Sequence, residues 1–355
     1  MRHAGSLSLT ALLLCACSGS AGPAGPAGGT GPQGPEGPPG ANADAGEPAV
    51  TSLVSSLDLP DSAPYPNSIS SSADGTLYVG GLLGQVVKFV TTSTKGQIMI
   101  PQVGPQGTVL ANLMVDQTSK TLWACGDLFH GTAQNPFADP AATLYAYDLD
   151  GNPKGSYPLP NQGSSLCEDI AVGSDGTVYV TDPFLGAIDV LSGATMATWK
   201  TDALLAANFQ NPVPPFGAHG VAVTGKNVFV GNFSTSSLFR IPIKNDGSAD
   251  AIVTENVTIT NPERLVALDD THLLVAEDVW CGSGALAKLT QSSTDQDTWS
   301  TTVLKNGILG ATSVTVANGS YYAVESQVCA IVTQLAGGPA ANPVLPFWID
   351  RIDAD

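Results

Sequence analysis

Two short runs of alternating apolar and polar residues, separated by a tight turn, recur along the chain. Between Leu166 and Asp182, such runs flank Asp175 and Gly176, so this stretch predicts two antiparallel strands joined by a two-residue reversal. Segment 187–191 predicts a third strand, and segment 197–200 predicts a fourth. Four short antiparallel strands in succession are typical of one propeller blade.

The same opening occurs six times. The first inward-facing apolar residues of the six repeats are Ile69, Leu113, Ile170, Val221, Leu265 and Val314. Their spacing of 44 to 57 residues is close to the blade length of propeller families, roughly 40–50 residues. We therefore predict an all-β fold, a six-bladed β-propeller of four-stranded antiparallel blades, over residues 49–355. Segments 50–58 and 347–352 both read as strands, and either would complete the sixth blade, so that the chain ends meet and close the ring.

The repeat also resembles a known group of propellers. The matching residues are the Asp-Gly-Thr-Leu-Tyr-Val run at 74–79, the related run at 175–182, and the third strands at 85–89 and 237–241. They resemble the NHL repeats and the broader SMP-30/gluconolactonase/LRE-like family over about residues 49–355. The resemblance implies a propeller and leaves the activity open, because many functions occur on this scaffold.

The N-terminal region predicts export. Residues 1–16 combine a basic start with an apolar core that ends in small residues, as in a secretory signal, and this core is too short to span a bilayer. The segment Leu14-Cys-Ala-Cys17 resembles a bacterial lipobox with Cys17 as the lipidated residue. Ordinary cleavage, which would release a free periplasmic or secreted chain, is the alternative. Because Ser18 stands where an Asp would imply inner-membrane retention, an outer-membrane or cell-surface location is favoured.

A collagen-like tract follows, with glycine at every third position through seven triplets between residues 22 and 42. We interpret residues 17–48 as a Gly/Pro-rich spacer, either disordered or in the polyproline-II conformation. At about 3.1 Å per residue, the tract would hold the propeller roughly 65 Å from its anchor. The alternative is a trimer in which three such tracts wind together around otherwise monomeric propellers.

The net charge and the absence of several known motifs reduce the number of possible partners and activities. The formal net charge is −18 and no basic cluster occurs, so nucleic acid and anionic lipid headgroups are poor partners, and no nucleic-acid binding is expected. The sequence has no P-loop, no dinucleotide-binding glycine motif and no Gly-x-Ser-x-Gly elbow. The acidity favours cations or neutral ligands.

Four cysteines lie outside the signal region, at Cys125, Cys167, Cys281 and Cys329. An even number in an exported chain indicates two disulfides. We favour Cys125–Cys167 and Cys281–Cys329 among the three pairings, because each pair falls on adjacent blades. A thiolate metal site is the alternative.

The candidate site is at the mouth of the central channel, where the first strand of each blade begins and the longer loops gather. The predicted ligand-binding residues there are Asn67, Asn112, Glu168, Asp182, His219, Asn232, Glu263, Glu277 and Glu325. Glu168, His219 and Glu263 start successive blades, and their carboxylate and imidazole groups suit a divalent cation, calcium or zinc. The alternative is a solvated polar channel without a metal.

The resemblance also implies positions for metal ligands, although the residues at these positions differ from those of the family. SMP-30-like lactonases hold a divalent metal with a Glu, an Asn and an Asp at strand starts, and these positions fall on Asn67, His219 and Glu263. None is identical, and Asn67 lacks the carboxylate. The sequence therefore predicts a surface-anchored binding module for a small molecule, glycan or protein, with a metal-dependent lactonase as the alternative.

Overall fold

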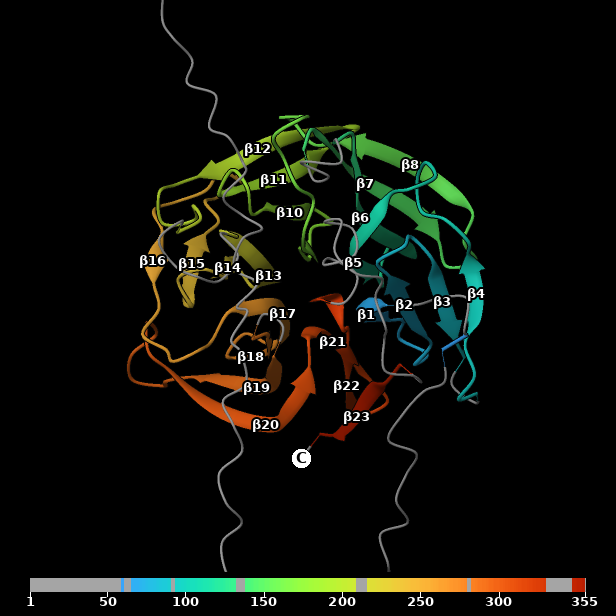
Figure 1. Ribbon diagram of the computed structural model, residues 1–355. Coiled ribbons are helices and arrows are strands. Elements are labelled where there is room, and N and C mark those ends of the chain that lie inside the picture. The colour runs from blue at the N-terminus through green and yellow to red at the C-terminus, as the bar shows by residue number, and fades with distance from the viewer. Residues whose placement is uncertain are drawn as a thin grey trace, which may run out of the picture.

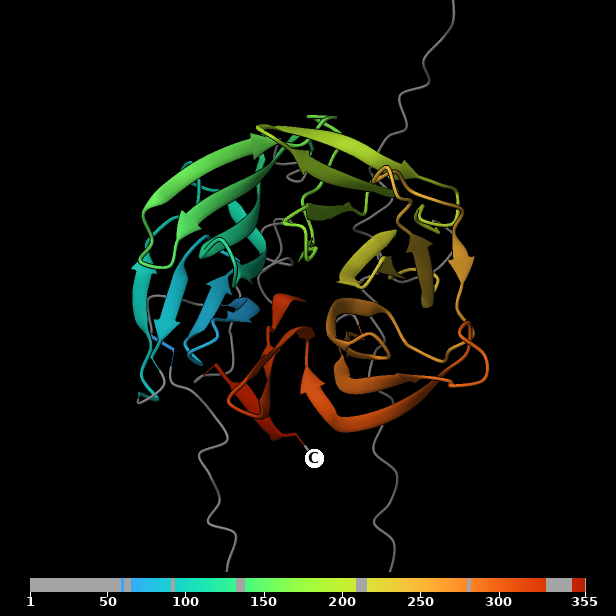
Figure 2. The ribbon, with the colours of Figure 1, turned by 180° about the vertical axis from the view of Figure 1, so that it is seen from behind.

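Six antiparallel sheets surround a common axis in the computed structural model of the chain (Figure 1; Figure 2 from behind). The structure describes residues 59–60, 65–90, 93–131, 138–208, 216–279, 282–329 and 347–354. The predicted six-bladed β-propeller is confirmed. The proposed signal segment, Cys17 and the spacer lie outside the described residues. No described helix has the length and apolar character needed to cross a bilayer.

The blades follow one another along the chain, and each consists of sequential antiparallel strands. Blade 1 comprises β1 Pro66–Ser71, β2 Leu77–Gly81, β3 Val86–Phe89 and β4 Gln97–Ile100. Blade 2 comprises β5 Val109–Asp116, β6 Thr121–Phe129, β7 Pro140–Asp148 and β8 Pro153–Pro158. Blade 3 comprises β9 Ile170–Val172, β10 Val178–Asp182, β11 Ala187–Ser192 and β12 Thr195–Thr201. Blade 4 comprises β13 Ala218–Thr224, β14 Asn227–Asn232, β15 Ser237–Pro242 and β16 Val253–Thr254. Blade 5 comprises β17 Pro262–Asp269, β18 His272–Glu277, β19 Ser283–Gln291 and β20 Trp299–Leu309. Blade 6 comprises β21 Ala311–Ala317, β22 Ser320–Glu325 and β23 Ile349–Asp353.

The ring closes between blade 6 and blade 1. The predicted C-terminal strand is β23, which pairs with β22 as the third strand of blade 6. The other predicted closing strand, 50–58, lies outside the described residues. At the junction, the Ile69 amide donates to the Ser313 hydroxyl at 3.2 Å, and the Ser71 and Thr315 hydroxyls lie 3.0 Å apart. These bonds join β1 to β21 and therefore link the first blade to the last.

The hydrophobic core is divided into layers between neighbouring blades. Apolar clusters fill each of the six blade interfaces within the described part of the chain. All six apolar residues from which the repeat was deduced are buried in these layers. Each blade thus buries its two faces against its neighbours, which explains why alternating strands of similar length recur around the ring.

The innermost strands share an irregularity near their N-terminal ends. In β1, β5, β13, β17 and β21, the register to the next strand shifts, as it does at a β-bulge. The residues inside the shifts are Asn67, Ala111, His219 with Gly220, Glu263, and Thr312 with Ser313. A bulge leaves a residue outside the ladder and re-aims its side chain. The repeated bulge therefore places one residue of each of these blades in an equivalent position near the axis.

Candidate functional site

Glu168, His219 and Glu263 come together from blades 3, 4 and 5. One potential ligand atom from each lies within 4.8 Å of the others. The Glu168 Oε1 is 3.9 Å from Nε2 of the imidazole, and the Glu263 Oε2 is 3.5 Å from its Nδ1. The two carboxylate side chains remain 12% and 15% exposed, whereas the imidazole is buried. The residues predicted as metal ligands thus form one cluster that solvent reaches from the carboxylate side.

The imidazole of His219 is held in a defined orientation. Its Nδ1 lies 3.2 Å from the Glu263 carbonyl oxygen, and because a carbonyl only accepts, Nδ1 carries the proton in this bond. Nε2 is then the unprotonated nitrogen and faces Glu168, the arrangement typical of metal-binding histidines. Burial lowers the pKa of His219 to about 4, so the ring is neutral at physiological pH. Gly220 lets β13 approach β17, because a Cβ there would lie 2.9 Å from the Leu265 nitrogen.

Carboxyl groups crowd around the imidazole. Burial raises the pKa of Glu168 to about 8, and burial together with the charges of Asp278 and Glu168 raises that of Glu263 well above its usual range. Burial also raises the pKa of Asp278 to about 6 and that of Asp127 well above normal, the latter with help from the charges of Glu168 and Asp182. Among the described residues, no lysine or arginine forms an ion pair with any of these five carboxyl groups, including that of Asp182. A bound cation would stabilise the ionised forms of these groups.

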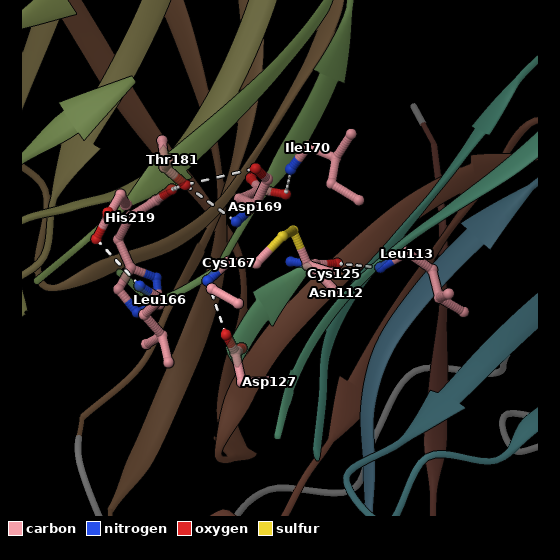
Figure 3. The surroundings of a disulfide bond; sticks show 12 residues. Asn112, Leu113, Cys125, Asp127, Leu166, Cys167, Asp169, Ile170, Thr181 and His219 are labelled. Atoms are coloured by element: carbon pink, nitrogen blue, oxygen red, sulfur yellow. Dashed lines mark hydrogen bonds between the residues drawn. A yellow bond between two sulfur atoms is a disulfide. The ribbon is translucent and has the colours of Figure 1, made fainter. Parts of the chain in front are cut away.

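The backbone around Glu168 is fixed by a disulfide (Figure 3). Cys125 of β6 is bonded to Cys167, with their Cα atoms 5.1 Å apart. The amide of Glu168 donates to the Thr181 carbonyl at 3.1 Å. The Thr181 hydroxyl in turn donates to the carbonyl of His219 at 2.5 Å. Blades 2, 3 and 4 are thereby joined within a few residues of the cluster.

The predicted pairing of Cys125 with Cys167 is confirmed. Cys329 is also disulfide-bonded. Its predicted partner, Cys281, lies outside the described residues, so that pairing stays a prediction.

A buried ion pair lies beside the cluster and was not anticipated from the sequence. Arg264 of β17 pairs with Asp169 through Nη1, and its Nη2 donates to the Leu113 carbonyl at 3.3 Å. The second carboxyl oxygen of Asp169 accepts the Val221 amide at 2.8 Å. These contacts connect blades 2, 3, 4 and 5 around the axis. Both charged residues are neighbours in sequence of cluster residues, because Asp169 follows Glu168 and Arg264 follows Glu263.

Three phenylalanines form an aromatic wall against His219. Phe216 and Phe233 have ring centroids 5.5 and 5.2 Å from the imidazole, and Phe184 stacks on Phe216 at 6.1 Å with an interplanar angle of 16°. Phe233 is fully buried, whereas Phe184 and Phe216 are half-buried. All three lie in loops outside the repeated strand pattern, which is why sequence periodicity did not identify them.

Asn67 and Asn112, two of the predicted ligand-binding residues, are engaged by neighbouring chain. The Asn67 amide donates to the Ala111 carbonyl at 2.7 Å, and its oxygen accepts the Ser326 hydroxyl at 3.1 Å. The side-chain oxygen of Asn112 accepts the amide of Leu113, the next residue, at 2.9 Å. These asparagines therefore stabilise the inner strands and the contacts between blades 6, 1 and 2.

The other predicted residues mainly organise loops. Asp182 accepts three backbone amides through Oδ1, and Glu277 accepts one through Oε1. Asn232 donates to two carbonyls of the loop before β13. Glu325 lies in blade 6, where burial and then the charge of Asp350 raise its pKa. Asp182 lies near Asp127, because its charge raises the pKa of that carboxyl, and its Oδ2 is buried without a hydrogen-bond partner in the described structure.

No protein-family model matches the sequence, and no curated protein matches it. Solved structures do resemble the fold. A virginiamycin B lyase from Staphylococcus aureus is 13% identical with a TM-score of 0.50, covering 84% of this chain and 98% of that one. A PQQ-bound aldose sugar dehydrogenase from Streptomyces coelicolor is 15% identical with a TM-score of 0.53, covering 85% and 96%. A gluconolactonase from Xanthomonas campestris is 13% identical with a TM-score of 0.53, covering 75% and 84%. At such identities, the chain is similar to these proteins in its propeller fold alone.

Proposed function

We propose that the chain is a divalent-cation-dependent hydrolase of the lactonase type, in which Glu168, His219 and Glu263 hold the cation. The observation that carries the proposal is the convergence of their three potential ligand atoms within 4.8 Å. Two carboxylates with one imidazole form a donor set that suits zinc, and the carboxylates also suit calcium. A gluconolactonase propeller among the similar structures is consistent with this class of chemistry.

The residues present fit such a cation. Nε2 of His219 is kept unprotonated by the bond from Nδ1 to the Glu263 carbonyl, so it is free to act as a ligand. Buried oxygens of Asp182 and Asp278 lack hydrogen-bond partners within the described residues, so negative charge near the site is undercompensated. When bound, a divalent cation polarises an ester carbonyl and acidifies a water molecule.

The chain itself supplies orientation and a base. Glu168 and His219 are held by the disulfide and by Thr181, so their relative position is fixed before a ligand arrives. Asp278 lies close enough to Glu263 for its charge to raise the pKa of that carboxyl. With its own pKa raised by burial to about 6, Asp278 is suited to accept a proton from an attacking water at neutral pH.

Calorimetric titration of the purified chain with zinc and with calcium tests the proposal. One equivalent of one of these cations should bind, and Glu263→Gln should abolish binding. Glu325→Gln is the matched control, because it removes a rim carboxyl in blade 6 that does not join the cluster. Failure of both cations to bind at millimolar concentration, or equal losses in the two variants, would refute the proposal.

A non-enzymatic binding module for a small molecule, glycan or protein is the second candidate. The observation in its favour is Asn67, which stands where the resembled lactonases have a metal-binding glutamate. Its side chain is committed to hydrogen bonds with Ala111 and Ser326, so this position does not join the cluster. Cation binding without hydrolysis of any lactone would favour this candidate over the hydrolase.

Location is a separate part of the proposal. We propose that lipidation of Cys17 anchors the chain to the outer membrane or cell surface, and that the collagen-like spacer carries a monomeric propeller. The sequence pattern of residues 14–42 supports this. Sedimentation of the full chain tests the monomer against a trimer formed through the spacer.

A further inference from the structure

We propose that this site takes an uncharged lactone or ester that carries an aromatic or other apolar ring, and that it discriminates against polyhydroxylated sugar lactones and carboxylate ligands. The inference rests on the proposed function and names its substrate class. It is carried by the aromatic wall of Phe184, Phe216 and Phe233 together with the absence of a free positive charge beside the described cluster.

The wall lies directly against the imidazole of the cluster. Phe216 lies between the imidazole of His219 and the stacked ring of Phe184. Phe233 packs edge-on against Phe216 from the buried side, with centroids 6.1 Å apart, and fixes its position. Phe184 and Phe216 are each half-buried, which leaves part of each ring surface accessible, and the carboxylate side chains of the cluster are 12% and 15% exposed. A ring attached to a carbonyl held at the cluster would pack against this surface.

The apolar surface extends beyond the wall. Leu185 follows Phe184 and is 39% exposed, and Leu204 is 45% exposed in the loop before β13. The two loops are tied together, because the Gly217 amide donates to the Pro183 carbonyl at 2.9 Å. A Cβ on Gly186 would come within 2.6 Å of the Ala206 backbone, so the loops are in direct contact. Aromatic wall and exposed leucines thus form one apolar sector over blades 3 and 4.

Charge separates this ligand class from sugar acids. The cluster contains several carboxyl groups, and the nearby guanidinium of Arg264 is buried and already paired with Asp169. A carboxylate ligand would therefore meet like charge, with no cationic side chain among the described residues as its partner and only the bound cation to offset the repulsion. The side chain of Asn232, which precedes Phe233, is also occupied, since its amide donates to two carbonyls and its oxygen accepts the Ser234 hydroxyl and the Thr235 amide. A polyhydroxylated ring packed against the wall would lose hydrogen bonds to water that the phenylalanine rings cannot replace.

Binding of non-hydrolysable lactams tests this inference without relying on turnover. Dihydroquinolinone is the lactam of an aromatic six-membered lactone, and gluconolactam is its polyhydroxylated counterpart. Both are titrated by calorimetry into the chain with and without zinc. The variants are Phe216→Asn, which makes the wall polar, and Phe216→Leu, which keeps it apolar. Leu83→Asn is the control, because Leu83 is an exposed apolar residue of the blade 1 turn between β2 and β3.

Dihydroquinolinone should bind at least about tenfold more tightly than gluconolactam. Phe216→Asn should remove this preference, and Phe216→Leu and Leu83→Asn should retain it. Equal or tighter gluconolactam binding, a preference that survives Phe216→Asn, or no lactam binding at all would overturn the inference. A separate zinc titration distinguishes the two proposals. Zinc binding without the preference refutes the inference alone, and the preference without zinc binding refutes only the cation-dependent function.

Discussion

The disulfide between Cys125 and Cys167 gives the sharpest prediction about stability. The bridge joins residues 42 apart in the sequence and links β6 of blade 2 to the start of blade 3. In the chain-entropy model, closing a loop of this length removes about 4 kcal/mol of conformational freedom from the unfolded state at 25 °C. That is a large fraction of the total stability of a typical domain, roughly 5–15 kcal/mol. The double variant Cys125→Ala/Cys167→Ala should therefore lose about 4 kcal/mol of unfolding free energy.

Guanidinium denaturation followed by tryptophan fluorescence measures the loss, since Trp123 packs in the same apolar layer as both cysteines. The single variants separate the cross-link from packing. Either single substitution already breaks the bridge, so each should cost nearly as much as the double variant. Additive losses from the two single variants, or a total below about 1 kcal/mol, would contradict the cross-link explanation.

The same variant probes the site. Glu168 follows Cys167 directly, so loss of the bridge frees the backbone that presents this carboxylate. Residues that support metal ligands from the second layer typically change metal affinity by about 10–100-fold. Zinc affinity of the folded double variant should fall within this range. Unchanged affinity would show that the disulfide stabilises the blades without positioning Glu168.

Three further predictions concern charge and anchoring. Arg264→Met should lower the free energy of unfolding, measured by denaturant titration, by about 3–5 kcal/mol, because it leaves the buried carboxylate of Asp169 without its partner. A loss below about 1 kcal/mol would contradict the importance of the pair. Burial, assisted by a neighbouring negative charge, raises the pKa of Asp189 from 3.8 to about 6. As the pH rises, this carboxyl therefore ionises in the unfolded chain before it ionises in the folded chain. The free energy of unfolding of the wild type should accordingly decrease as the pH rises from about 4 to about 6. Asp189→Asn should remove the contribution of this residue to the slope and gain at most about 3 kcal/mol at pH 8 in pH-dependent denaturation, and an unaltered slope would refute the assignment. Cys17→Ala should move the exported chain from the membrane fraction to the soluble fraction, and continued sedimentation with membranes would exclude lipidation at this residue.

The sequence by itself determined the architecture. Strand alternation has a period of two residues and the blade repeats along the chain, so the six inner apolar residues, the closing strand near the C-terminus and the pairing of Cys125 with Cys167 could be deduced from local pattern. The same repetition identified Glu168, His219 and Glu263 as residues at equivalent positions of successive blades. Residues at the same position of the sequence repeat occupy the same place in each folded blade, because every blade has the same strand arrangement.

Tertiary structure decided which of the equivalent residues meet. Asn67 occupies the same bulge position as His219 and Glu263, yet its side chain bonds to Ala111 and Ser326 and takes no part in the cluster. The pair of Arg264 with Asp169 and the aromatic wall were not predicted, because they depend on contacts across the axis and between loops that no strand periodicity encodes. Short-range alternation specifies how each blade folds, whereas the site depends on distances between residues far apart in the chain, and these are fixed only when the ring closes.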